Sequence, residues 1–483
     1  MNCALRNIII GLLAILSVSI AHAQEADLNT YGCGTRTSAE LIKDISSFTP
    51  ALANLKRTAV ADTLPLSIHI VGKDDGTGYI SLDLLLRMLC KLNDKYTGTG
   101  ISFYVKWPIQ YINNSAYYTH VASVGAQMMR ENNVPDAANI YFVNDPDGTC
   151  GYYQPSTRAV AIKNSCAGTN STTLTHELGH FLGLPHTFYG WEDGQTPTNA
   201  EKVTRGTGAN CNTAGDGFCD TDADYLAERW NCPYKGNKTD VNGDFYHPDP
   251  TLYMSYSADN CMTRFSDMQI AWMQNTIGSS YPTLAASTAP AYHELAAPNI
   301  IYPTDTIHAN LQYIIWNKVQ DAEVYYIRVT QKQTGRLLAE TTTADTILAL
   351  NGELMQDNTY TIRMAAMNGV NICRGNMPSR DYAFTNKPTD LTLQSFSGVT
   401  QGIRSFPNPA TQTLNVYLDF MPVGDYKISL RNISGQLVHQ YNYTHNGVNA
   451  AINIAVTDMA NGLYFLYVAG GGKTISQKVV VTH

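Results

Sequence analysis

The stretch Thr175–Thr187 reads THELGHFLGLPHT, and the interpretation of the whole chain starts from it. Its first part is an H-E-x-x-H pattern. His176 and His180 are four residues apart, so on a helix they lie on one face and can reach a single ion. Glu177 follows the first histidine and can reach a water on that ion without being a ligand itself. The spacing therefore predicts a metal site on a helix.

Gly183 and His186 extend the pattern by x-x-G-x-x-H. Glycine tolerates positive φ, so the chain can turn at Gly183 and carry His186 back as a third ligand. Three histidines and a water make the open tetrahedral site of a catalytic zinc. Two other interpretations stay open. One is a buried helix with hydrogen-bonded histidines, and the other is a zinc whose third ligand is His247 or a later carboxylate.

Length, composition and charge limit the class of protein. A chain of 483 residues predicts about two to four domains. Its 44% hydrophobic and 15% charged residues are typical of globular proteins. The net charge of −8 and the lack of any basic run argue against nucleic acid or an anionic membrane as a partner.

Residues 1–23 are predicted to be a secretory signal peptide. Arg6 supplies the positive start, and the apolar run Ile8–Ile20 is short for a membrane span. Ala21–Ala23 is an A-x-A cleavage site. No later stretch is apolar enough for a transmembrane helix. We therefore expect an exported protein that is either soluble or held at the cell surface by something other than a helix.

Nine cysteines remain after this peptide is removed. Export favours disulfides, and the odd number leaves at least one thiol unpaired within the chain. Their connectivity does not follow from the sequence, but six of them flank the histidine motif and predict a stapled, loop-rich half of the site. The nine are Cys33, Cys90, Cys150, Cys166, Cys211, Cys219, Cys232, Cys261 and Cys373.

Residues 24–57 are predicted to be a propeptide. Cys33 stands between two glycines, and its thiolate can occupy the open position of a zinc ion. It can equally be an ordinary free or paired cysteine, with Cys90 as one partner. Lys56-Arg57 offers a basic cleavage site just before the first expected strand.

Residues 58–285 are predicted to be the catalytic domain, with a mixed α/β sheet. Period-two alternation predicts strands, and leucines at helical spacing after a serine predict one helix. The strand Tyr152–Ile162 can be the edge to which an extended peptide substrate adds. The other expected elements are strands Pro65–Val71, Ile101–Val105 and Asn139–Val143 and helix Ser81–Asn93.

The segment Gly206–Tyr256 loses regular periodicity and contains two acidic knots, Asp216–Asp222 and Asp240–Asp244. Alternating oxygen side chains around a glycine suit calcium, which takes many oxygen ligands. The same residues also favour solvated turns. Calcium is therefore expected at the first knot, and a turn is the other interpretation of either knot.

The methionine in Tyr253-Met254-Ser255-Tyr256 completes a recognisable set. Together with the long histidine motif about seventy residues earlier, it resembles a metzincin zinc peptidase. The sequence HELGHFLGLPHTF, the cysteine-rich insert and Cys261-Met262 resemble the pappalysin family in particular. The resemblance covers about residues 31–280.

The resemblance implies roles for particular residues. It implies that His176, His180 and His186 bind zinc and that Glu177 is the general base and acid. It also implies that Met254 forms a hydrophobic floor below the site and that Tyr256 supports the metal or the oxyanion.

Further roles are implied by the same resemblance. Cys33 would hold the zymogen latent, and Cys232 would pair with Cys261. Calcium would lie near Asp216, Asp220 and Thr221. The pocket for the residue after the scissile bond would end at Asp259-Asn260. An acidic residue there would favour a basic substrate side chain, but here Asn260 directly precedes the cysteine.

Beyond residue 290 the chain is predicted to be all β. Residues 296–388 resemble a fibronectin type III domain, with a tryptophan on an early strand and a tyrosine on a late one. Residues 402–483 carry Phe406-Pro407-Asn408-Pro409 near their start and resemble the C-terminal sorting domain of the Bacteroidetes type IX secretion system. A second adhesive sandwich is the other interpretation of this last segment. The expected fold is an α/β metzincin domain followed by two all-β sandwiches.

These observations predict a secreted bacterial zinc endopeptidase, made as a latent zymogen, that acts on proteins or peptides. Its expected cofactors are zinc and calcium, and its second expected partner is the type IX secretion machinery. The alternative is a surface adhesin with an incidental or inactive metal domain. Zinc-dependent cleavage of casein or gelatin separates the two.

Overall fold

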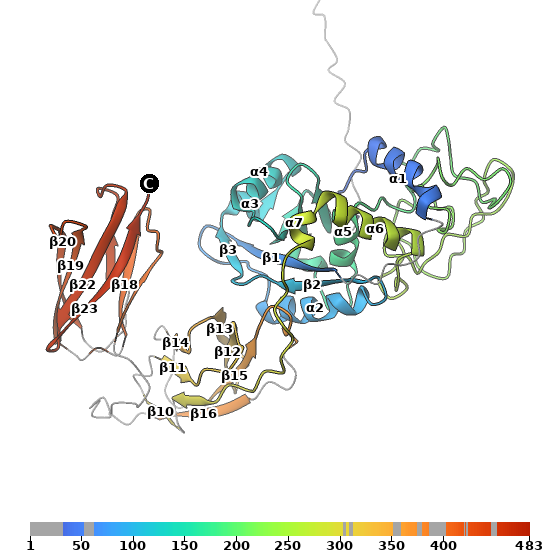
Figure 1. Ribbon diagram of the computed structural model, residues 1–483. Coiled ribbons are helices and arrows are strands. Elements are labelled where there is room, and N and C mark those ends of the chain that lie inside the picture. The colour runs from blue at the N-terminus through green and yellow to red at the C-terminus, as the bar shows by residue number, and fades with distance from the viewer. Residues whose placement is uncertain are drawn as a thin grey trace, which may run out of the picture.

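The computed structural model describes residues 32–52, 62–302, 306–308, 313–350, 359–373, 379–385, 402–419, 421, 424–445 and 452–483. The expected signal peptide and the expected cleavage site at Lys56-Arg57 lie outside these residues. Figure 1 shows a layered α/β part, coloured blue to yellow-green, followed by two parts made of strands.

A mixed sheet forms the centre of the α/β part. Its order is β2-β1-β5-β8-β7, and β3 also pairs with β1. The pairs β1–β2, β1–β3, β1–β5 and β5–β8 are parallel, whereas β7 runs antiparallel to β8 at the edge. The strands are β1 (Asp62–Gly72), β2 (Ile101–Val105), β3 (Gln110–Asn113), β5 (Ala138–Val143), β7 (Gly151–Gln154) and β8 (Ala159–Lys163).

Both faces of this sheet are covered, so its central strands β1 and β5 are buried and mainly apolar, with Ser67, His69 and Asn139 as buried polar residues. In β5, Ile140 and Phe142 join the core on one face, where α2 (Leu82–Lys95) and α5 (Thr173–Phe181) contribute leucines. Tyr141 and Val143 join the core on the other face, with α3 (Ser115–Tyr118) and α4 (Ala122–Asn132). The two shortest strands, β4 (Thr119–His120) and β6 (Asp145–Pro146), pair separately.

The expected single strand Tyr152–Ile162 is wrong in one respect. It is a hairpin of β7 and β8, and the turn between them includes Arg158 at φ 52°. The pattern of apolar residues continues through the tight turn, so the sequence alone predicts one strand where the structure has two. The edge position expected for substrate addition belongs to β7 alone.

The cysteine-rich segment between Leu182 and Phe265, all of which is described, holds turns and isolated bridges instead of helices or strands. Disulfides Cys211–Cys219 and Cys232–Cys261 lie within it, so the pair implied by the family resemblance is present. Helices α6 (Asp267–Ser280) and α7 (Pro282–Ala285) follow it. The short helix η1 (Asn164–Cys166) precedes α5, and Cys166 pairs with Cys150.

Two sheets form the first all-β part. One has the order β10-β16-β15-β12-β13 and the other β14-β11-β9, and buried Trp316 and Tyr360 share the core with strands of both. The strands are β9 (Ile300–Tyr302), β10 (Thr306–His308), β11 (Tyr313–Trp316), β12 (Val324–Gln331), β13 (Leu337–Thr343), β14 (Ile347–Ala349), β15 (Thr359–Met367) and β16 (Ser379–Thr385).

The last part also has two sheets, with the orders β17-β18-β21 and β20-β19-β22-β23, around one apolar core. Gly435 makes the turn between β19 and β20 at φ 78°. The strands are β17 (Gly402–Phe406), β18 (Thr413–Asp419), β19 (Gly424–Asn432), β20 (Leu437–His445), β21 (Ile452–Ala455), β22 (Gly462–Gly470) and β23 (Lys473–Val481). Among the described helices of the chain, none has the length and apolar character that a bilayer span requires.

Candidate active site

Helix α5 carries the first part of the motif and ends where the glycine requires it. Gly183 adopts φ 85°, and a side chain there would approach Trp272 and Thr276 of α6 to 2.9 Å. The Trp272 indole donates to the Gly183 carbonyl at 2.8 Å. The chain therefore turns sharply after Leu182 and returns His186 to the face of α5 that holds His176 and His180.

The three imidazoles converge through their Nε2 atoms. His180 Nε2 lies 3.1 Å from His176 Nε2 and 3.2 Å from His186 Nε2. The Nδ1 atoms of His176 and His180 each lie 2.7 Å from a backbone carbonyl, of Tyr253 and Leu184 respectively. A carbonyl partner places the proton on Nδ1, so the Nε2 lone pairs point at one another. This arrangement is unfavourable without a cation between the rings, and the donor set fits zinc.

Cys33 completes this group. Its Sγ and one nitrogen of each of the three histidines lie within 4.8 Å of one another, which is the ligand set of a four-coordinate zinc. The alternative ligand His247 instead lies beside Tyr234, with ring centroids 6.5 Å apart, and is not part of the group.

Met254 lies directly below α5. It is fully buried, and its Sδ would be 2.4 Å from a Cβ built on Gly179, so only glycine fits at that point of the helix. The Met254 carbonyl accepts from Thr187 N at 3.1 Å. The methionine turn thus holds both the helix and the segment after His186 by packing and by a backbone hydrogen bond.

Glu177 faces the same centre. Its Oε2 accepts from Thr35 Oγ1 at 3.1 Å and from Cys33 Sγ at 3.4 Å, whereas its buried Oε1 has no hydrogen-bond partner among the described residues. Burial raises the pKa of Glu177 to about 8. The sequence did not single out Thr35 as a contact of Glu177, although it follows Cys33 and Gly34 directly.

The segment around Cys33 joins the edge of the sheet through an isolated bridge. Cys33 bridges Gly151 in parallel, Gly34 N donates to Gly151 O at 2.8 Å and Cys150 N donates to Gly32 O at 2.9 Å. The Tyr256 hydroxyl accepts from Cys33 N at 2.8 Å and donates to Cys33 O at 3.2 Å. Tyr256 therefore holds the backbone of Cys33 in this form of the chain.

The disulfides exclude the competing arrangement for Cys33. Cys90 pairs with Cys373, and of the nine described cysteines Cys33 is the one with a free thiol. A thiol separated by 143 intervening positions from Glu177 thus lies beside it through tertiary contacts, not through a disulfide.

Two family models match parts of the chain. Residues 158–278 match the family model of pregnancy-associated plasma protein-A, and residues 404–482 match that of the secretion system C-terminal sorting domain. An extracellular metalloprotease of Colletotrichum graminicola is 27% identical over 284 residues, covering 53% of this chain and 93% of the fungal protein. Human pappalysin-1 is 30% identical over 138 residues, 28% of this chain and 8% of pappalysin-1.

The chain carries a pappalysin-type metzincin peptidase domain and a secretion sorting tail. A solved structure of mirolysin in complex with compound 9 is 18% identical, covering 47% of this chain and 96% of that chain. The TM-score of this match is 0.35.

The acidic knot of the pappalysin-type domain differs in part from the expected calcium group. Asp216 is fully buried and accepts from Thr221 Oγ1 at 3.0 Å. Asp220 uses both carboxylate oxygens at the start of α6, where Ser266 Oγ and Met268 N donate to them at 2.8 Å. It is therefore engaged elsewhere, and the sequence could not show this because the two segments are far apart in the chain.

A carboxylate that the sequence did not single out lies beside Asp216 instead. Glu201 is 2% exposed, and its Oε2 faces the backbone of Gly215 without a hydrogen-bond partner among the described residues. Its Oε1 pairs with Arg205 at 2.8 Å. Burial and the Asp216 charge raise the pKa of Glu201 to about 9. Two buried carboxylates with one arginine are short of positive charge, which is what a calcium ion would supply.

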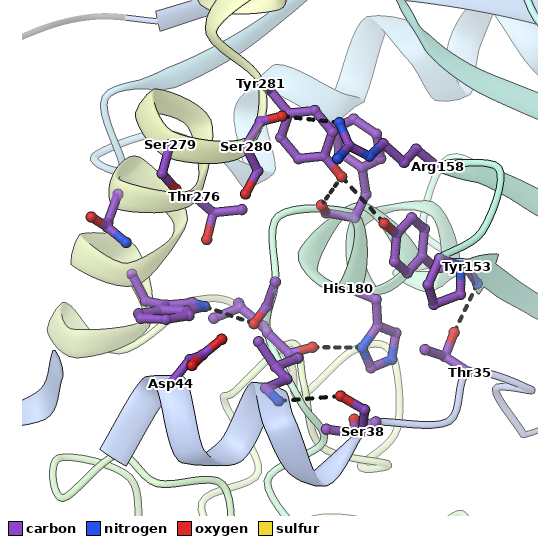
Figure 2. Close-up of a pocket in the computed structure, with 18 of the residues that line it drawn as sticks. Thr35, Ser38, Asp44, Tyr153, Arg158, His180, Thr276, Ser279, Ser280 and Tyr281 are labelled. Atoms are coloured by element: carbon purple, nitrogen blue, oxygen red, sulfur yellow. Dashed lines mark hydrogen bonds between the residues drawn. The ribbon is translucent and has the colours of Figure 1, made fainter. Parts of the chain in front are cut away.

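Two cavities adjoin the histidines, the larger lined by His180 and the smaller by His176. A large one, of about 630 Å³, extends from His180 between α1 (Ala39–Leu52) and α6 (Figure 2). Figure 2 shows Ser38 and Asp44 on one side of it, Thr276 and Ser279 of α6 on another, and Tyr153 close to Tyr281. A small one, of about 30 Å³, lies between Cys33, Glu177, Tyr256 and Arg229.

Proposed function

We propose that the protein is a secreted zinc endopeptidase made as a latent precursor. The observation that carries this proposal is the buried cluster of three convergent histidines with Glu177 and Cys33 beside them. Such a cluster has no use in a purely structural helix, because three neutral imidazoles facing one another stabilise nothing without a cation.

The chemistry follows from the residues around the cluster. His176, His180 and His186 would hold the zinc ion, which supplies a Lewis acid and an activated water when bound. Glu177 accepts a proton from the attacking water through its unpartnered Oε1 and donates it to the leaving amine. Tyr256 is free to donate a hydrogen bond to the carbonyl oxygen once its contact with Cys33 is lost.

The edge strand β7 offers the backbone for a substrate. An extended peptide can add to it, since among the described residues β7 pairs only with β8 and with the bridge at Cys33. The 32–35 segment lies on that edge now, so it blocks the substrate's place as well as the open coordination position. Latency therefore follows from one segment acting at two points, and removal of residues 24–57 would relieve both.

The sorting tail indicates secretion or attachment at the bacterial surface, which agrees with the extracellular relatives. We propose the type IX machinery as its partner. We also propose that calcium binds at Asp216, Glu201 and Thr221 and stabilises the loop-rich half of the peptidase domain.

The test is cleavage of casein by the processed protein, with and without a zinc chelator. We expect chelator-sensitive cleavage that zinc restores, and Glu177→Ala should retain zinc while losing activity by about 10³-fold or more. Casein cleavage by the Glu177→Ala variant would contradict the role of Glu177. A wild-type chain that is processed and zinc-loaded but inactive would favour the adhesin instead.

A further inference from the structure

The three clustered histidines differ in what holds the ring nitrogen that faces away from the cluster. The Nδ1 atoms of His176 and His180 each lie 2.7 Å from a backbone carbonyl oxygen. The side chain of His186 is 1% exposed, and its Nδ1 has no hydrogen-bond partner among the described residues. A buried ring nitrogen without a partner costs free energy and leaves the tautomer of the ring unfixed. The third histidine therefore lacks the support that the other two have.

The carboxylate of Glu192 lies beside this nitrogen. Its Oε1 is 3.5 Å from His186 Nδ1, which is within the range of an ion pair but longer than a normal hydrogen bond. Its Oε2 accepts from Gly190 N at 2.6 Å, so the turn after His186 holds the carboxylate in place. An approach of roughly 0.7 Å would convert the contact into a charge-assisted hydrogen bond from Nδ1–H to Oε1.

The turn that carries Glu192 is itself held firmly. The backbone N–H of Trp191 donates to Phe188 O at 3.0 Å. The Trp191 side chain is buried in a small apolar cluster with Tyr246, and the ammonium of Lys238 lies 3.9 Å from the centroid of its indole ring. The backbone of the residue that follows Trp191 is therefore fixed, and only the side chain of Glu192 is left to adjust.

The faces of the His186 ring are also covered. The ring stacks on Phe188, with centroids 4.6 Å apart and an interplanar angle of 12°, and meets Tyr256 edge-on at 5.2 Å. These contacts fix the plane of the ring but not the nitrogen that carries the proton. A carboxylate that faces Nδ1 decides this, because it accepts from a proton there and leaves the lone pair of Nε2 free for a metal ion.

The negative charge of Glu192 suits the cluster as well. Three neutral imidazoles and the Cys33 thiolate would leave one net positive charge around a zinc ion in a buried site. The backbone carbonyls behind His176 and His180 carry no net charge, whereas Glu192 places a full negative charge behind the third imidazole. This carboxylate therefore offsets charge that the proposed ligands leave over.

We propose that Glu192 is a positioning residue, which holds the proton of His186 on Nδ1 and so strengthens the hold of His186 on the metal ion. The proposal rests on the zinc site proposed above and adds to it a residue that does not touch the ion. A cation on Nε2 makes Nδ1–H a stronger donor, so metal binding and the contact with Glu192 should support each other.

The first test is the zinc affinity of the unprocessed full chain, measured by competition with a chelating dye. We expect Glu192→Ala to raise the zinc Kd by about 10–100-fold. Glu192→Gln should raise it less, because the amide oxygen still accepts from Nδ1–H but carries no charge. Asp193→Ala removes the exposed acid next to it in the same turn and should leave the Kd unchanged. A folded Glu192→Ala chain with the wild-type Kd would overturn the proposal.

A second measurement separates support of the ring from support of the turn. With cobalt(II) in place of zinc, the Nδ1–H proton of each ligand histidine gives a paramagnetically shifted signal that exchanges with water. We expect one of these signals to exchange faster in Glu192→Ala than in the wild type, while the melting temperature of the metal-free protein stays the same. Unchanged exchange together with a lowered melting temperature would show that Glu192 only holds the turn, which overturns the proposal.

The remaining outcomes keep this proposal apart from the peptidase function. If Glu192→Ala does not fold, Glu192→Gln takes its place in both measurements, and a wild-type Kd in that folded variant would overturn the role of its charge. A wild-type chain that binds no zinc would overturn the zinc site and this proposal together. A chain that binds zinc with the expected dependence on Glu192, but cuts no casein after processing, would overturn the peptidase function alone.

Discussion

At the scale of single residues, the site is held by contacts that join distant parts of the chain. Cys33 and Thr35 reach Glu177 across more than a hundred residues, and Tyr256 binds both backbone groups of Cys33. Because these contacts all end on the reaction centre, small changes in them should appear in activity before they appear in stability.

Cys33→Ala should convert the precursor into a partly active enzyme. The thiol is free and lies among the zinc ligands, and its tether gives it a high effective concentration there. We expect casein cleavage by the unprocessed variant at least about tenfold above that of the unaltered precursor, with faster self-cleavage near Arg57. Activity no higher than that of the precursor would rule out the switch.

Glu201→Gln should remove the stabilisation of the protein by calcium. A ligand that binds only the folded state at a hundred times its Kd stabilises by about 2.7 kcal/mol. For a domain of this size that corresponds to roughly 5–10 °C in Tm. The measurement is the melting temperature with calcium and with a calcium chelator. Glu228→Gln, an exposed acid of the same loop, is the control and should behave like the wild type. A Glu201→Gln variant that calcium stabilises as much as the wild type would count against this site.

At the scale of elements, helix α1 closes one side of the large cavity. Ile45 is fully buried against the backbone of Gly217, and Phe48 packs edge-on against Trp272 of α6, with centroids 5.4 Å apart. Figure 1 shows α1 at the end of α6, beside the loop-rich segment. The apolar contacts of α1 thus help to hold the N-terminal segment, which Cys33 also attaches to the reaction centre.

Ile45→Ala should loosen α1 without touching the zinc ligands. Removing a buried isoleucine side chain costs about 2–4 kcal/mol, which would raise the detached population of α1 by about 30-fold or more. We expect faster amide exchange across residues 39–52 and faster processing of the precursor by trypsin. Lys43→Ala changes an exposed side chain of the same helix and should leave both rates as they are. Equal exchange in the two variants would mean that α1 contributes little to latency.

At the scale of the whole molecule, the first all-β part is joined to the peptidase domain by shared packing. Val324, Tyr326, Met367 and Ile372 belong to the same buried cluster as the peptidase sheet. Val105 N of β2 donates to Gly369 O at 2.8 Å, so a loop of the sandwich covers the edge of that sheet. Disulfide Cys90–Cys373 adds a covalent link.

Two truncations should therefore behave differently. Deleting residues 402–483 should leave a folded, active enzyme made in a heterologous host, while blocking its secretion in the native bacterium. Deleting residues 296–483 should also expose the shared core and the β2 edge and remove a disulfide worth about 2–5 kcal/mol. The measurements are soluble yield, melting temperature and casein cleavage. Equal stability of the two truncated proteins would show that the sandwich is an independent appendage, and normal secretion of the shorter deletion would contradict the sorting role.

The sequence by itself determined those features that depend on local spacing. The histidine motif predicts a helix with two ligands on one face, a glycine turn and a returning third histidine, because each step spans only a few residues. The strands β1 and β2 follow from period-two alternation, and β5 follows from a short apolar run that is buried on both faces. The odd cysteine count left at least one thiol unpaired within the chain, and Cys33 was a candidate that the sequence could not separate from a paired cysteine.

Only the tertiary structure decided which distant groups meet. Asp220 binds the start of α6, and Glu201 lies beside Asp216 where Asp220 was expected. The sequence could not show this, because both acids lie on loops whose path leaves no local pattern. Arg229 forms an ion pair with Asp259, which is the same kind of long-range contact. The physical reason is that local pattern reflects burial and backbone geometry, whereas pairing between loops depends on how the whole chain closes around the sheet.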